Sequence, residues 1–85
     1  MANVQRLVLD ILKPHQPNAL EFANAIAALG VGYRVNVRVL EVDEKTETLQ
    51  VAIEGDKLDF ALISTAIGEI GASLHSIDEV SVVGE

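Results

Sequence analysis

Residues 33–55, YRVNVRVLEVDEKTETLQVAIEG, decide the fold because they contain two strand-like patterns joined by a polar turn. Valine recurs at positions 35, 37 and 39, and apolar residues recur at positions 49, 51 and 53. Side chains alternate between the two faces of a strand, so each pattern predicts a strand with one buried face. We therefore expect a hairpin with a three-residue tip at residues 44–46. Its expected pairs are Val39 with Val51, Val37 with Ile53, and Glu41 with Leu49.

Two further strands are predicted, one before this hairpin in the sequence and one after it. Residues 4–13, VQRLVLDILK, are rich in Val, Ile and Leu and predict a strand, which Pro14 ends because proline has no N–H to donate. Gly55 is expected to end the second strand of the hairpin. Residues 73–83 predict a last strand that is irregular near Ser76.

Two helix patterns separate these strands. Residues 19–29 have apolar side chains at helical spacing, and they follow Asn18, which has a glutamate three positions later, as in a capping box. Residues 58–70 repeat the helical spacing, with Asp56 as the expected N-cap and Gly71 as the expected end. The resulting order of elements is βαββαβ.

This order predicts an α+β, ferredoxin-like fold: a four-stranded antiparallel sheet in the order 4-1-3-2, with two helices on one face. The pattern contains no linker, so residues 1–85 are expected to form a single domain. The helix-free face then carries much aliphatic surface, which usually marks a contact, and self-association is the simplest explanation. Its expected members are Val8, Leu12, Asn36, Arg38, Leu40, Val42, Gln50 and Ala52.

The composition narrows the functional classes. Thirteen acidic and six basic residues give a formal net charge of -7, which disfavours binding to nucleic-acid phosphates. The absence of cysteine excludes thiolate catalysis and zinc–thiolate sites. The sequence has no apolar run of about 18 residues and no leader-like pattern, so we expect no membrane partner and a cytoplasmic location.

The only two histidines, His15 and His75, are placed by this topology at one end of the sheet, near Asp10. A histidine beside a carboxylate can act as an acid/base pair or bind a metal, but turn and hydrogen-bonding roles also suffice. Asp10, Lys13 and Arg38 are expected either to fix the register between subunits or to be exposed to solvent. The candidate polar cluster comprises Asp10, Lys13, His15, Arg38 and His75.

Acidic residues form the candidate metal site. The hairpin segment contributes Asp43, Glu44 and Glu47, and the last strand contributes Asp78 and Glu79. Carboxylate oxygens suit calcium or magnesium, but the glycine and spacing of an EF-hand loop are missing, and a solvated acidic turn is the alternative. The two groups are expected to lie too far apart within one subunit, whereas edge-to-edge assembly would bring them together.

The segments LVLDILKPH (7–15), VNVRVLEVDEKTETLQVAIEG (35–55), LDF (58–60) and LHSIDEVSVVG (74–84) resemble the archaeal domain-of-unknown-function family 211. The resemblance implies a ferredoxin-like fold and a homo-oligomer, expected to be a closed ring, with divalent-cation binding as a candidate property and no established activity. The chain departs from the family pattern at residues 32–34. The positions that match the family's polar pattern are Asp10, Lys13, His15, Glu41, Asp43, Glu54, His75, Asp78 and Glu79.

Three functional hypotheses follow. The leading one is a noncatalytic, ring-forming homo-oligomer whose acidic residues bind calcium or a related cation. The second is a regulatory module that binds a small metabolite at subunit interfaces. The third is an enzyme that uses His15 or His75 with Asp10, although the sequence contains no nucleophile elbow or phosphate loop.

Overall fold

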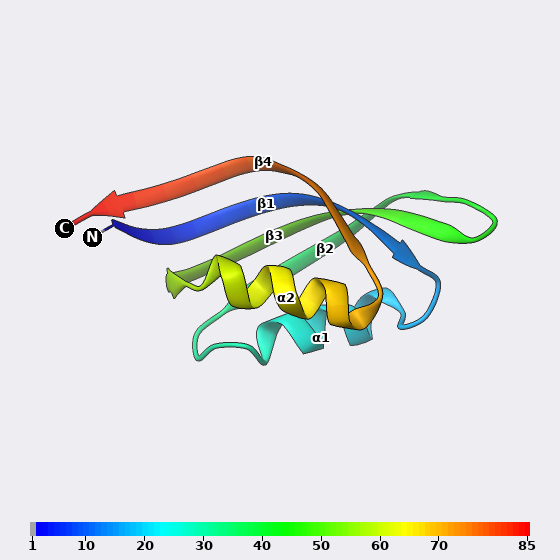
Figure 1. Ribbon diagram of the computed structural model, residues 1–85, viewed down its shortest axis with the longest axis horizontal. Helices are drawn as coiled ribbons and strands as arrows, with labels where there is room; N and C mark the ends of the chain where they lie inside the picture. The colour runs from blue at the N-terminus through cyan, green and yellow to red at the C-terminus, as the bar shows by residue number, and fades with distance from the viewer. Residues whose placement is uncertain (1) are drawn as a thin grey trace.

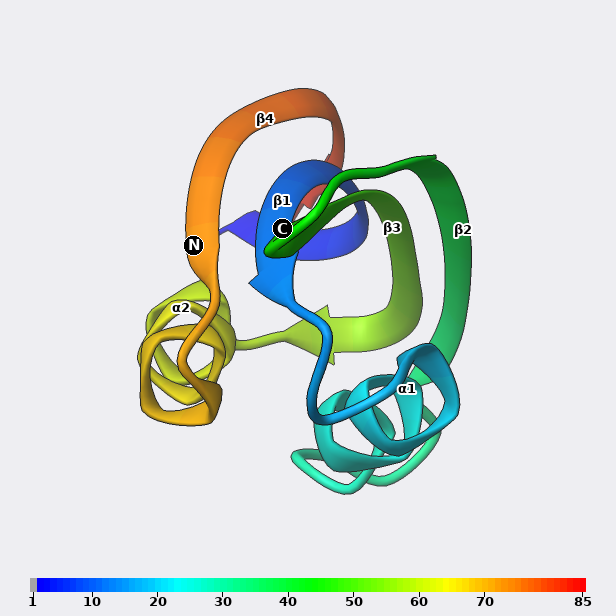
Figure 2. The same ribbon diagram turned by 90° about the vertical axis from the view of Figure 1, so that its right-hand side faces the viewer.

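The computed structural model describes residues 2–85 and has an α+β fold. Its elements are β1 (Ala2–Pro14), α1 (Ala19–Ala27), β2 (Arg34–Val42), β3 (Thr46–Leu58), α2 (Phe60–Ile70) and β4 (Ser73–Gly84). The strands form one antiparallel sheet in the order β2-β3-β1-β4, which is the predicted order read from the other edge. Figures 1 and 2 show both helices on the same face of the sheet. The arrangement is compatible with the ferredoxin-like pattern.

The core lies between the sheet and the helix layer. β3 buries alternate side chains, as the period of a strand requires, and β1 does the same except that Val8, on its helix-free side, is also buried at 7% exposed. Each helix buries two residues four positions apart on one face. Within residues 2–85, neither helix has the length and apolar character needed to cross a bilayer. The apolar residues that are 0% exposed are Leu9, Ile11, Phe22, Ile26, Leu49, Val51, Ile53 and Ile63.

The hairpin between β2 and β3 has a register that differs from the predicted one by two residues. The three predicted pairs are wrong, but a shift of two residues leaves every side chain on its own face of the sheet. The apolar pattern therefore identified which side chains are buried, but it did not identify which residues pair across the two strands. The observed pairs are Val35 with Ile53, Val37 with Val51, Val39 with Leu49, and Glu41 with Thr48.

The turn explains this shift. The backbone N–H of Asp43 donates to the carbonyl oxygen of Thr46 at 2.8 Å, and Val42 pairs with Glu47, so the tip spans residues 43–46. The ladder also skips Leu40, which makes a β-bulge in β2. A four-residue tip and one bulge together replace the predicted three-residue tip.

The junction between β3 and α2 also differs from prediction. β3 does not end at Gly55 but continues to Leu58, which is buried. The N-cap of α2 is Asp59, whose side chain accepts a hydrogen bond from the N–H of Leu62 at 3.0 Å, so Asp56 as the N-cap is wrong. Burial of the Leu58 side chain extends the strand past the glycine.

The remaining helix ends follow the predicted signals closely. Asn18 and Glu21 form the capping box of α1, which ends at Ala27, two residues earlier than expected. Gly71 is the C-cap of α2 and has a φ of 94°, which glycine adopts without the steric cost of a Cβ atom.

β4 is irregular near Ser76, as predicted. Its ladder with β1 skips His75 and then Asp78, so each is the extra residue of a β-bulge. Both are exposed to solvent.

Candidate functional site

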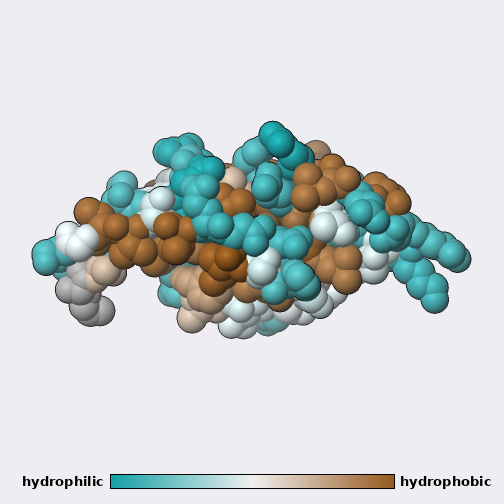
Figure 3. All heavy atoms as spheres, turned by 90° about the horizontal axis from the view of Figure 1, so that it is seen from above, coloured by the Kyte–Doolittle hydropathy of each residue, from teal (hydrophilic) through white to brown (hydrophobic). Residues whose placement is uncertain are grey.

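The helix-free face of the sheet carries aliphatic side chains among polar ones, as predicted. Figure 3 views the molecule from the side opposite the helices and shows apolar patches between hydrophilic groups. Leu12 and Leu40 are 42% and 56% exposed. Val42 was predicted for this face, but the bulge at Leu40 places it in register with Glu47, whose carboxylate contacts Lys13 on the helix side. Val42 therefore lies on the helix side, and its predicted place on the helix-free face is wrong.

A second apolar surface follows the outer strand β4. Three of its residues pair with core-side residues of β1 and therefore lie on the helix side of the sheet. In Figure 1, β4 runs back along α2 and continues past the N-terminal end of this helix. We call these three residues the β4 apolar row; they are Ile77, Val80 and Val82, which are 48%, 52% and 52% exposed.

Asp10 and His75 meet on the helix-free face. Nδ1 of His75 lies 3.2 Å from Oδ2 of Asp10, and the His75 side chain is 76% exposed. Gln50 pairs with both Asp10 and Arg38, so these three residues occupy one row across the sheet. Within residues 2–85, Arg38 forms no ion pair. The cation of Arg38 is therefore available to an external partner.

Lys13 is fully buried on the opposite face of β1. Its Nζ donates to the carbonyl oxygens of Pro14 at 2.9 Å and Pro17 at 2.6 Å, and it lies 3.0 Å from Oε1 of Glu47. Three acceptors thus satisfy the three N–H donors of the ammonium group. The lysine ties the loop after β1 to the start of β3.

His15 completes this contact from the loop. Its Nδ1 lies 3.1 Å from Oε2 of Glu47, and its Nε2 lies 3.0 Å from the carbonyl oxygen of Glu44. Hydrogen bonds first to Glu47 and then to Glu44 raise the pKa of His15 above its usual 6.5. Hydrogen bonds from His15 and then Lys13 lower the pKa of Glu47. Both ring nitrogens face acceptors, so the charged imidazolium is the form that fits.

The predicted polar cluster is therefore two separate groups. Asp10, Arg38 and His75 belong to the helix-free face, whereas Lys13 and His15 join Glu47 on the other side. A cluster of Asp10 with Lys13 is wrong because residues 10 and 13, an odd number of positions apart in one strand, point to opposite faces.

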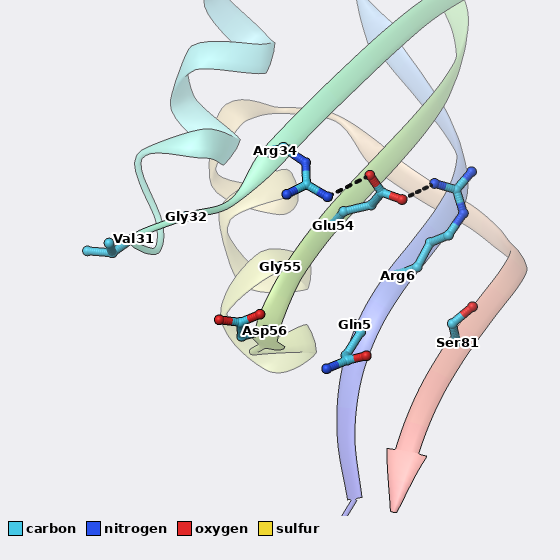
Figure 4. Close-up of a pocket in the computed structure, with 9 residues that line it drawn as sticks. All are labelled: Gln5, Arg6, Val31, Gly32, Arg34, Glu54, Gly55, Asp56 and Ser81. Carbon is cyan, nitrogen blue, oxygen red and sulfur yellow. Dashed lines mark hydrogen bonds and ion pairs between the residues drawn. The ribbon is translucent and has the colours of Figure 1, made fainter.

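Arg6, Glu54 and Arg34 form a chain of ion pairs across three strands. One oxygen of Glu54 lies 2.7 Å from Nη1 of Arg6, and the other lies 3.1 Å from Nη2 of Arg34. Arg6 also contacts Glu79 at 2.7 Å. Figure 4 shows the side chains of Arg6, Arg34 and Glu54 at the border of a hollow, which has a volume of about 520 Å³. The other lining residues are Gln5, Val31, Gly32, Gly55, Asp56 and Ser81.

The ion pairs neutralise most of the charge in this hollow. Hydrogen bonds from Arg34 and then Arg6 lower the pKa of Glu54, and hydrogen bonds to Glu79 and then Glu54 raise the pKa of Arg6. Sequence reasoning missed this group. The three residues lie on one row of the sheet, and only the strand order together with the correct register could have placed them side by side.

The acidic residues predicted to bind a cation remain in two groups within one chain. Glu47 contacts Lys13 and His15, and Glu79 contacts Arg6. Asp78 accepts a hydrogen bond from the Ser76 hydroxyl at 2.7 Å. Among residues 2–85, no three histidine or acidic side chains come together as metal ligands.

Comparison with known proteins identifies relatives of this chain. The model of domain-of-unknown-function family 211, described as uncharacterized ArCR, matches residues 5–85. An uncharacterized protein of Methanocaldococcus jannaschii, MJ0319, is 45% identical over 80 residues, which cover 94% of this chain and 82% of the relative. The chain belongs to this archaeal family of uncharacterized proteins, family 211.

Proposed function

We propose that this protein is a noncatalytic component that assembles with copies of itself. The observation that carries the proposal is the β4 apolar row, in which Ile77, Val80 and Val82 are each about half exposed on the helix side of an edge strand. Burying the exposed half of such a side chain contributes about 1 kcal/mol. A second copy would cover these side chains together with the aliphatic part of the helix-free face.

A noncatalytic role is supported by the placement of the two histidine–carboxylate pairs. His75 with Asp10 lies on the helix-free face, and His15 with Glu47 lies on the helix side. The two pairs therefore cannot act together on one substrate. Lys13 and two backbone segments further restrain Glu47, which suits a structural role.

We propose that the copies form a closed ring. When one surface of each copy contacts a different surface of the next, the copies repeat head to tail. They close into a ring if a whole number of the rotations between neighbours makes one full turn. Calcium or magnesium would bind the hairpin carboxylates of Asp43 and Glu44, with water or acidic groups of another copy completing the oxygen ligands. Glu47 and Glu79 are less suited to a cation because basic side chains already contact them.

Native mass spectrometry of the wild type at micromolar concentration tests assembly. We expect a species of several copies, and we expect Val82→Lys to shift it towards monomer because a charge would be placed in the covered row. Leu20→Lys is the matched control, since Leu20 is 70% exposed on α1, and it should leave the assembly intact. A wild type that stays monomeric at this concentration contradicts the proposal.

The cation is tested separately by adding calcium in the same experiment. Bound ions in proportion to the number of copies, lost in an Asp43→Asn, Glu44→Gln double variant, would support it. If adding calcium or magnesium changes neither the mass nor the melting temperature, cation binding is contradicted. The proposal of self-assembly is not affected by that result.

The second candidate is a regulatory module, which the hollow beside Arg6 and Arg34 favours. A small metabolite that carries both charged and neutral polar groups would suit its lining, and an adjoining copy would enclose the open side. A thermal-shift screen of amino acids and nucleotides should then find a stabilising compound whose effect Arg34→Gln abolishes. No stabilisation by any of them would exclude this candidate.

A further inference from the structure

We propose that the two edges of the sheet pair with each other, so that β2 of one copy lies antiparallel to β4 of the next. This inference rests on the proposed self-assembly and names the surfaces that carry it. β2 and β4 each have one strand neighbour within residues 2–85, which leaves their outer backbone groups free to form another ladder. An edge strand with free N–H and C=O groups is a template for such pairing.

The topology makes this pairing continuous. β2 and β4 run antiparallel to each other in the sheet, because each is antiparallel to a strand of the inner antiparallel pair. A copy added beside β2 in the same orientation therefore presents β4 in the antiparallel sense, with its helices on the same side. Each further copy repeats the same contact.

Side-chain alternation matches apolar residues across this contact. Directly opposed residues share a face, so β2 residues on the helix side must meet the β4 apolar row. The helix-side residues of β2 include Val35 and Val37, which are both partly buried. When the rows of the sheet are extended without stagger, Val37 lies in the row of Ile77, and Val35 lies in the row of Val80. An aliphatic residue of β2 thus meets a member of the β4 apolar row in each of these two pairs.

The charges of the two edges are complementary. β2 carries Arg34 and Arg38 along its length and Glu41 near the hairpin, whereas β4 carries Asp78 and Glu79 and has no lysine or arginine. Arg38 lies in the row of Asp10, which pairs with Ser76, so extending that row without stagger brings Arg38 near residues 76–78 of the neighbour. Pairing of two β4 edges would instead oppose like charges.

Charge reversal tests this contact. Arg38→Glu and Asp78→Arg should each convert the assembled wild type mostly to monomer at a concentration where the wild type is assembled, as measured by sedimentation velocity. A chain that carries both changes should assemble again, because its edges are complementary with the signs exchanged. An equimolar mixture of the two single variants should also assemble, with equal numbers of each chain in the mixed species.

Controls separate this contact from a general effect of charge. Lys57→Glu and Glu69→Arg change the net charge by the same amounts at exposed positions away from both edges, and they should leave the assembly unchanged. Circular dichroism checks that each variant is folded. If the wild type assembles and both single variants assemble equally well, or the double variant does not recover, edge pairing is overturned while self-assembly stands. A monomeric wild type instead overturns self-assembly itself.

Discussion

At the scale of single residues, Lys13 is the most constrained group in the molecule. It is the one charged residue that is 0% exposed among residues 2–85, and its ammonium group contacts Glu47 and two backbone carbonyl oxygens. A buried charge is tolerated when its donors are all paired, and removing one partner leaves the others uncompensated. The contact joins the β1–α1 loop to the hairpin.

Replacing this lysine should destabilise the fold. In Lys13→Met, Glu47 keeps only His15, and two carbonyl oxygens lose their donor, so the free energy of unfolding should fall by about 3 kcal/mol. Urea denaturation at pH 7 measures the change. Lys45→Met, at the exposed hairpin tip, is the matched control and should change stability by less than about 0.5 kcal/mol. Equal effects of the two changes would contradict the structural role of Lys13.

The pair of His15 and Glu47 should make stability depend on pH. The pKa of His15 is raised above 6.5, so its contribution is complete below pH 6.5 and disappears as the pH rises through the folded-state value. The pKa of Glu47 is lowered below 4.5, so its contribution is complete above pH 4.5 and disappears as the pH falls through the folded-state value. The pair therefore stabilises most between these two limits.

His15→Gln measures this effect when its melting temperature is compared with that of the wild type across pH. The difference should be largest at about pH 5.5 and should shrink as the pH rises through the folded-state pKa of His15, where the wild-type histidine loses its proton. Introducing His15→Gln into a Glu47→Gln background should leave little pH-dependent difference. A difference that stays constant from pH 5.5 to 8 would show that protonation of His15 does not contribute.

At the scale of elements, the end of α2 depends on backbone conformation. Gly71 has a φ of 94°, where a Cβ atom is strained, whereas Gly68 lies inside the helix with no atom within 4 Å of the Cβ position. Position 71 therefore favours glycine, whereas position 68 can accept a residue with a Cβ atom.

The same substitution at these two glycines should have effects of opposite sign. Gly71→Ala should lower the free energy of unfolding by about 1 kcal/mol, because alanine is strained in the left-handed conformation. Gly68→Ala should raise it by about 0.5 to 1 kcal/mol, because alanine loses less conformational entropy in a helix. Urea denaturation of both variants checks this, and effects of the same sign would contradict the conformation at one of the two sites.

Element ends illustrate what local sequence can predict. Asn18 and Gly71 were predicted correctly because their signals act over a few neighbouring residues. Asp56 was wrong because burial of the Leu58 side chain, a contact with the rest of the core, extends β3 past Gly55. Local signals predict ends only where packing does not compete with them.

At the scale of the whole molecule, the half-exposed apolar residues along β4 are the surface that the proposed assembly would cover. In the proposed assembly, folding of each chain is coupled to association with its neighbours. Mass action then stabilises the folded state as the protein concentration rises.

The melting temperature should therefore increase with protein concentration. Differential scanning calorimetry between about 5 and 500 μM should show a rise for the wild type and for Leu20→Lys. Val82→Lys should melt at a lower temperature that does not change over this range. A concentration-independent melting temperature for the wild type would argue against coupled folding and assembly.

The sequence by itself determined the order of elements, the strand order and, apart from Val42, the faces of the first three strands. These follow from the periods of apolar residues and from the few topologies that connect βαββαβ elements. It also proposed that Asp10 lies beside His15 or His75, but it could not decide that the partner is His75.

Only the tertiary structure decided which residues meet. A hairpin shift of two residues preserves the apolar pattern, so periodicity could not distinguish the predicted register from the observed one. The row of Arg6, Glu54 and Arg34 depends on that register. The contact of Lys13 with Glu47 depends on the pairing of β1 with β3, and the exposure of the β4 apolar row depends on how far α2 reaches along the sheet. The physical reason is that periodicity records which side of an element is buried, whereas partners are selected by turns, bulges and packing between distant segments.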